Sequence, residues 1–248
     1  MRDVEEYEQT FMKMDFERYQ EKYRRRLVEK VIDTYAAEGC SILEIGCGLM
    51  PLFVDYQDEY FFTVVEPADH CYENAKALSE NYNKVVCRQG FFEDAVERIK
   101  WSKFDIVICS GLLHEVENPG ALLRAMKLVC DKNSIVHINV ANALSFHRLL
   151  AKEMGLIESV YQLSDSNLAL QQHNVFDLEQ LKKLVSGEGY QIIDSGSYFL
   201  KPFTHRQMQQ CMDARILNEN ILDGLDRLCE IYLKDFGSEI YLNARIKP

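Results

Sequence analysis

A glycine turn with a carboxylate just upstream is the first feature of this chain that could do chemistry. Residues 42–48 read Ile-Leu-Glu-Ile-Gly-Cys-Gly, so Glu44 lies two positions before Gly46, and Cys47 separates Gly46 from Gly48. Glycine lets a backbone turn tightly and approach a ligand where a Cβ would collide. The stretch predicts a nucleotide-type cofactor loop that follows a buried strand, although two glycines alone also suit an ordinary strand-to-helix connection.

Further side chains of the same character follow at later strand ends. Glu66, which precedes Pro67, comes about 20 positions after the glycines, where a carboxylate can accept hydrogen bonds from a ribose diol. Phe92, Glu93 and Asp94 follow the third predicted strand, and bring an aromatic ring and two carboxylates to the same edge. Asp94 also suits the N-cap of a helix, which is compatible with a ligand contact.

Candidate general bases lie at or beside the same predicted edge of the fold. Ser110 and Gly111 end a fourth apolar run, and His114, His147 and His173 follow in or near segments expected at that edge. Histidine is the side chain best tuned to accept a proton near neutral pH. His114 is the first choice as a catalytic base and His147 the second, while a structural or surface role remains open for each of the three.

Alternating strands and helices must position these residues. Strands are predicted at 41–45, 60–65, 84–87, 104–109, 134–140, 190–200 and 238–246, and helices at 69–79, 119–129 and 177–186. This alternation predicts an α/β fold with a doubly wound, mostly parallel sheet. Ligands of such sheets bind at the carboxyl ends of the strands, so the candidate residues are expected to meet there.

The chain is expected to form one domain, residues 1–248, with helical additions. Residues 1–37 would form an N-terminal helical cap, 38–140 the cofactor-binding core, and 141–176 and 201–236 helical insertions. The helical part of the last insertion could be a lid, the interface of a possible homodimer, or a cover for the final strands. The sequence leaves these three open.

Composition limits the class of partner. The formal net charge of −11 disfavours a protein that grips nucleic-acid phosphates. The eight cysteines include no C-x-x-C pair, which indicates reduced, buried thiols and no metal site. No segment approaches the roughly 18 apolar residues of a membrane span. A soluble, cytoplasmic protein with a small-molecule partner is expected.

The strand-end residues together resemble class I S-adenosylmethionine-dependent methyltransferases. Glu44, Gly46 and Gly48 match the acid-x-Gly-x-Gly pattern of that family. An NAD-type dinucleotide fold would need a third glycine, but Pro51 stands at that position and the next glycine is Gly90. The resemblance implies a Rossmann-like sheet of seven strands with the last strand antiparallel, and S-adenosylmethionine as cofactor.

The resemblance also implies a role for each residue. Glu66 would bind the ribose, and Glu44 would accept hydrogen bonds from loop amides or water near the methionine ammonium. Asp94, or Glu93 beside it, would accept a hydrogen bond from the adenine amino group while Phe92 packs on the adenine ring. Related enzymes bring an N-terminal helix over the cofactor. Tyr23 and the arginine run that begins at Arg24 lie on such a helix, and one of these arginines could pair with the methionine carboxylate.

Further stretches of the sequence resemble two narrower groups of methyltransferases. Residues 104–119 are similar to the fourth-strand motif of small-molecule methyltransferases related to ubiquinone biosynthesis, although Glu115 stands where histidine is usual. Residues 139–148, 154–157 and 196–203 look like bacterial methyltransferases of surface-polysaccharide and capsule gene clusters, with Ala141 in place of the usual proline.

The narrower resemblance implies O-methylation of a sugar, a phosphoramidate or another small polar glycan precursor. An acceptor that is already anionic would need no base, and the histidines would then bind charge. Two alternatives remain: a catalytically silent partner subunit that binds the cofactor, and an NAD-type oxidoreductase.

Overall fold

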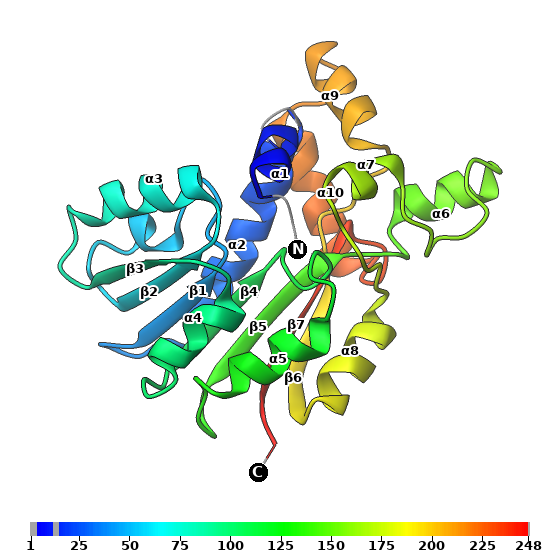
Figure 1. Cartoon of the computed structure of the whole chain (residues 1–248). Coiled ribbons are helices and arrows are strands. Elements are labelled where there is room, and N and C mark those ends of the chain that lie inside the picture. The colour runs from blue at the N-terminus through cyan, green and yellow to red at the C-terminus, as the bar shows by residue number, and fades with distance from the viewer. Residues whose placement is uncertain (1–3, 12–14, 248) are drawn as a thin grey trace.

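Alternating strands and helices form one sheet with helices on both faces (Figure 1). The structure is a computed structural model that describes residues 4–11 and 15–247. Its strands are β1 (Ser41–Ile45), β2 (Phe61–Glu66), β3 (Val85–Gln89), β4 (Ile106–Ser110), β5 (Ile135–Ala141), β6 (Tyr190–Tyr198) and β7 (Glu239–Ile246). Its helices are α1 (Val4–Phe11), α2 (Glu17–Tyr35), the 3-10 turn η1 (Leu52–Asp55), α3 (Asp69–Ser79), α4 (Phe92–Ile99), α5 (Pro119–Lys127), α6 (Phe146–Glu153), α7 (Asp165–Ala169), α8 (Leu178–Gly187), α9 (His205–Asp213) and α10 (Glu219–Ile231).

The described strands are ordered β3-β2-β1-β4-β5-β7-β6. β7 runs antiparallel to β5 and β6, and the other described pairings are parallel. The predicted doubly wound, seven-stranded sheet with an antiparallel last strand is confirmed. Strand ends differ from the predicted ones by at most two residues.

The central strands are apolar because helices cover both of their faces. In β1, Leu43 and Ile45 belong to the core that includes residues of α4, α5 and α8. Ile42 belongs to the opposite core, with α2, η1 and α3. Successive side chains of a strand point to opposite faces, so Glu44 is a buried carboxylate on the same face as Ile42.

Local sequence signals explain where several helices begin. α5 has Pro119 at its first position, and the Asn118 side chain accepts a hydrogen bond from Ala121 N at 3.0 Å. The suggested N-cap at Asp94 is wrong. α4 follows Phe91 as its N-cap, and Asp94 lies inside the first turn, where a carboxylate still interacts favourably with the helix dipole.

The N-terminal helix α2 packs against the C-terminal part of the chain. The rings of Tyr23 and Phe199 are stacked with centroids 4.2 Å apart. Ion pairs join Lys22 to Glu219 and Lys30 to Glu230 of α10. Figure 1 shows α1, α9 and α10 above the carboxyl edge of the sheet, with α2 running from this group down behind the sheet. Residues 1–3 and 12–14 of the predicted cap lie outside the described residues.

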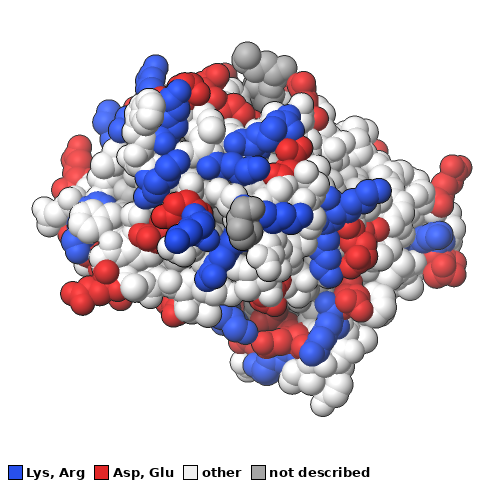
Figure 2. All heavy atoms as spheres, turned by 90° about the horizontal axis from the view of Figure 1, so that it is seen from below, with Lys and Arg blue, Asp and Glu red and all other residues white. Residues whose placement is uncertain are grey.

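The surface shows no segregation of charge on the face seen in Figure 2. Lys and Arg side chains are interspersed there with Asp and Glu. Among the described helices, none has the length and apolar character needed to cross a membrane.

Candidate active site

A cavity of about 1100 Å³ opens at the carboxyl ends of β1, β2 and β4, under residues of α2. β1 lies between β2 and β4, which makes this the point where the chain reverses its direction across the sheet and where open α/β folds bind ligands. The predicted cofactor and base residues that line it are Arg24, Glu44, Gly46, Cys47, Gly48, Glu66, Pro67, Phe92, Glu93, Asp94, Ser110, Gly111 and His173. Tyr23, His114 and His147 are not among its lining residues.

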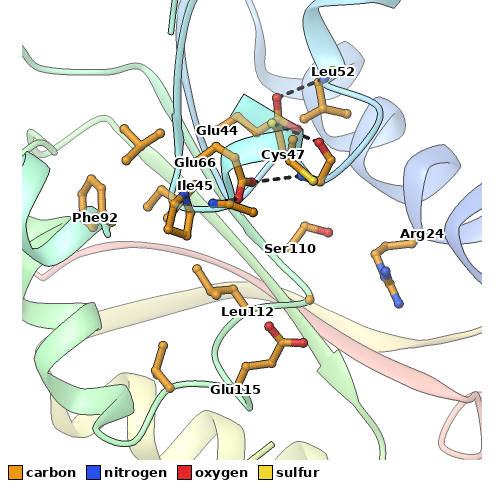
Figure 3. A pocket seen from close by; sticks show the side chains of 18 of the residues that line it. Arg24, Glu44, Ile45, Cys47, Leu52, Glu66, Phe92, Ser110, Leu112 and Glu115 are labelled. Atoms are coloured by element: carbon orange, nitrogen blue, oxygen red, sulfur yellow. Dashed lines mark hydrogen bonds between the residues drawn. The ribbon is translucent and has the colours of Figure 1, made fainter. Parts of the chain in front are cut away.

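The glycine turn and Glu66 are joined by hydrogen bonds. Gly46 and Gly48 have φ values of +76° and +56°, a region that L-residues with a Cβ avoid. Glu66 accepts from Gly48 N at 3.1 Å and from Ala68 N at 2.8 Å (Figure 3). Burial raises the pKa of this carboxyl, while the two amides act in the opposite direction. Each carboxylate oxygen keeps a lone pair for a ligand hydroxyl.

Glu44 holds the far end of the same loop. Its Oε2 accepts from Leu52 N at 3.0 Å, at the start of η1, where a helix leaves backbone amides without partners. The side chain is 5% exposed, and burial raises the pKa of Glu44 to about 8. Glu44 is therefore largely protonated near neutral pH, and the sulfur of its neighbour Cys47 is a neutral thiol because burial raises that pKa too.

Phe92, Glu93 and Asp94 line the cavity at the start of α4, and Figure 3 shows Phe92 on the side away from Arg24. Phe92 is 3% exposed, whereas Glu93 and Asp94 are exposed at the start of α4. A flat apolar ring beside carboxylate acceptors has the chemistry that an adenine would contact.

The three consecutive arginines of α2 reach three different parts of the molecule. Arg24 donates to Glu239 at 3.0 and 2.5 Å and to Glu17 at 3.1 Å, and its guanidinium lies against Gly111. Arg25 reaches the glycine loop. Arg26 pairs with Asp223 of α10 at 2.6 Å. The pairing of one arginine with a methionine carboxylate stays a prediction.

Tyr23 belongs to the packing of α2. The side chain is 2% exposed, stacks on Phe199 and donates to Asp223 Oδ1 at 2.9 Å. Tyr23 therefore packs α2 against the C-terminal part of the chain and does not line the cavity.

The β4 side of the cavity carries a different set of polar groups. Ser110 Oγ lies 3.2 Å from Asn139 Oδ1, which also accepts from Gly111 N at 2.9 Å. Figure 3 shows the Glu115 carboxylate pointing into the space near Ser110 and Arg24. Glu115 is only 6% exposed, so it is a buried carboxylate on the wall of the cavity.

The three candidate histidines differ in whether their side chains reach the cavity. His173 is exposed at the cavity, and its backbone N donates to His114 O at 3.1 Å. The His114 side chain is buried. His147 lies on α6, and burial, followed by the charge of Lys201, holds its pKa well below the usual range. Of the three, the structure brings His173 alone to the cavity.

Two acidic cavity residues, and the contact of Arg25 with the glycine loop, were not predicted from the sequence. Glu115 and Glu117 line the wall after β4, and the sequence signal for them is two acidic residues directly after a buried strand and its turn. Arg25 has no such signal, because its place in an arginine run does not tell which neighbour contacts the loop.

Comparison with known proteins identifies the class. Residues 16–195 match the family model described as Methyltransferase domain. The chain therefore belongs to this methyltransferase family. It is an S-adenosylmethionine-dependent methyltransferase, and the NAD-type alternative is set aside. No curated protein matches the chain in sequence.

Solved structures share the fold at low sequence identity. The plantazolicin methyltransferase BamL, in complex with a triazolic desmethylPZN analog and SAH, has a TM-score of 0.63 and 18% identity, covering 97% of this chain and 90% of that chain. The [4+2]-cyclase SpnF has a TM-score of 0.59 and 16% identity, covering 90% and 81%. Magnesium protoporphyrin IX methyltransferase (ChlM) from Synechocystis PCC 6803 has a TM-score of 0.57 and 13% identity, covering 90% and 83%. At these identities the likeness shows the fold alone.

The residues present fit the cofactor. S-adenosylmethionine carries a sulfonium cation, which neighbouring unpaired cations would repel. Of the five lysine and arginine residues that line the described cavity, Lys22, Arg24, Arg25 and Arg26 are each paired with a carboxylate of another element, and the fifth is Arg18. The acceptor oxygens of Glu66 and the open glycine turn then match the ribose and the backbone approach that the cofactor needs.

Proposed function

We propose that this enzyme methylates an oxygen atom of a small polar acceptor, a sugar or a related precursor of a bacterial surface polysaccharide. The observation that carries the proposal is the extent of the cavity. Its volume of about 1100 Å³ slightly exceeds the roughly 300–1,000 Å³ of drug-sized ligand sites. There is room for an acceptor beside the cofactor.

The polar side chains on the β4 side of the cavity support an acceptor that loses a proton when it is methylated. With the ribose at Glu66 and the adenine near Phe92, the methionine end of the cofactor would extend past Ser110 toward Arg24 (Figure 3). Ser110, Glu115 and His173 line that side. When bound, S-adenosylmethionine supplies an electrophilic methyl group on sulfur. The chain's task is to hold the acceptor oxygen in line with that bond and to take its proton.

His173 and Glu115 are the two groups placed to take that proton. His173 is the predicted base that reaches the cavity, and Glu115 is a carboxylate that points into it. One of them would accept the hydroxyl proton, and the other would hydrogen-bond a neighbouring hydroxyl of the acceptor. For an anionic acceptor such as a phosphoramidate, no proton transfer is needed, and His173 would contribute to binding only.

The test is transfer of a labelled methyl group from S-adenosylmethionine to a panel of sugar nucleotides and sugar phosphates. We expect a methyl ether, identified by mass spectrometry. The variants H173Q and E115Q separate the two roles: loss of the base lowers kcat by about 10²–10⁴, whereas loss of a binding group raises KM. Glu153→Gln, an exposed carboxylate on α6, is the matched control.

A methyl group found on nitrogen would refute the oxygen assignment. Full activity of both H173Q and E115Q would show that neither group takes a proton from the acceptor.

A further inference from the structure

Arg25 makes an unusual set of contacts with the cofactor loop. Its Nη1 donates to Met50 O at 2.7 Å and its Nη2 to Pro51 O at 3.1 Å. Its Nε donates to Asp55 Oδ2 at 2.6 Å, in η1. One guanidinium on α2 thus bonds two consecutive carbonyls of the loop and a carboxylate of the turn that follows.

Three other elements also hydrogen-bond residues 46–52, and the backbone bond from Gly46 N to Val65 O of β2 is one of these contacts. Gly48 N donates to Glu66 of β2, and Leu52 N donates to Glu44 of β1. Asn74 Nδ2 of α3 donates to Leu49 O at 2.7 Å. Side chains therefore make several of the hydrogen bonds that hold this loop, and among the described residues of α2 Arg25 is the one that bonds it.

We propose that Arg25 is a positioning residue for the cofactor: it fixes the glycine loop so that Gly48 N and the Glu66 carboxylate stay aligned for the ribose. This assigns Arg25 a role toward the protein backbone and not toward the methionine carboxylate. The proposal concerns the cofactor end of the cavity and does not depend on the identity of the acceptor.

The geometry explains why the residue is an arginine. The guanidinium presents five N–H donors in a rigid, planar fork, which can serve two carbonyls and a carboxylate at once. A lysine ammonium is a point charge on a flexible stem and cannot span the same three acceptors. Arg25 is also only 23% exposed at its side chain, so its bonds are partly protected from water.

The test compares two ligands that share the ribose and adenine. S-adenosylhomocysteine has the amino-acid carboxylate, and 5′-methylthioadenosine lacks it. Calorimetric dissociation constants are measured for both ligands with the wild type, R25A and the control K30A. Lys30 lies on the same helix and forms an exposed ion pair with Glu230, so K30A removes one α2 charge away from the loop.

We expect R25A to weaken both ligands by about tenfold or more and by similar factors, because two charge-assisted bonds to the loop are lost. K30A should leave both constants within about twofold. Amide hydrogen exchange of residues 46–52 should accelerate in R25A and remain unchanged in K30A. A structural role elsewhere would not produce that local change.

Two outcomes would overturn the proposal. Weakening of S-adenosylhomocysteine alone would mean that Arg25 binds the carboxylate directly, and unchanged affinity for both ligands would mean that the loop does not need it. If R25A does not fold, R25K and D55N give the same comparison. Both should weaken the two ligands in parallel and by less than R25A, because each keeps part of the network.

Discussion

Replacing Glu44 by glutamine should remove a pH dependence of the free energy of unfolding while leaving that free energy nearly unchanged at pH 5. Glu44 is buried and its pKa is raised from 4.5 to about 8, chiefly by burial, with the Leu52 amide acting in the opposite direction. In the unfolded chain the carboxyl loses its proton near pH 4.5. Between these two pKa values the folded state binds one more proton than the unfolded state.

The sign follows from proton linkage. When the folded state holds the additional proton, the free energy of unfolding falls as the pH rises, by about 1.4 kcal/mol per pH unit. From pH 5 to pH 8 the wild type should therefore lose about 4 kcal/mol from this one group. The contribution is fully present below pH 4.5 and is lost as the pH approaches the folded pKa of about 8.

The glutamine side chain of E44Q has nearly the shape of the protonated carboxyl and can still accept from Leu52 N, but it does not titrate. The free energy of unfolding is measured by urea titration at several pH values without cofactor. The difference between E44Q and wild type should be near zero at pH 5 and should grow in favour of E44Q toward pH 8. Glu80→Gln, at an exposed site after α3, should give a flat difference.

Parallel curves for E44Q and wild type would show that Glu44 ionises at its ordinary pH and that the loop end is open to water. A difference of opposite sign would show that the ionised form of Glu44 is the stabilising one, as for a carboxylate paired with a cation.

The sequence predicted many of the residues that line the cavity because they lie at or shortly after the ends of strands. β1 and β4 are buried on both faces, so their composition marks them as strands, and parallel strands bring their carboxyl ends to one edge. Gly48, Glu66 and Asp94 were therefore placed at this edge by chain order, whereas Glu44 was chosen through the acid-x-Gly-x-Gly resemblance. The placement by chain order required only that the position of each strand in the sheet be predicted correctly.

Residues whose partners are distant in sequence could not be placed this way. Arg24 and Arg25 are adjacent on α2, yet Arg24 pairs with Glu239 of β7 and Arg25 with the loop after β1. The orientation of α2 over the sheet determines which partner each arginine contacts. The same limit applies to His147 and His173: the chain after α7 folds back onto residue 114, which brings His173 to the cavity and leaves His147 outside it.

Three further variants test the site. Glu66→Gln should weaken S-adenosylhomocysteine by about 10- to 100-fold in calorimetry, because the amide replaces a charged acceptor at the ribose; unchanged affinity would contradict the ribose role. Gly48→Ala should lower the free energy of unfolding by about 1–2 kcal/mol in urea titration, since its φ is +56° and a Cβ there meets nothing within 4 Å; a neutral effect would mean that the turn relaxes. Tyr23→Phe should cost about 1 kcal/mol of stability through the lost bond to Asp223, with S-adenosylhomocysteine affinity within about twofold. The stacked ring on Phe199 is retained in this variant, so a tenfold loss of affinity would instead place the Tyr23 hydroxyl at the cofactor and contradict its position behind the cavity.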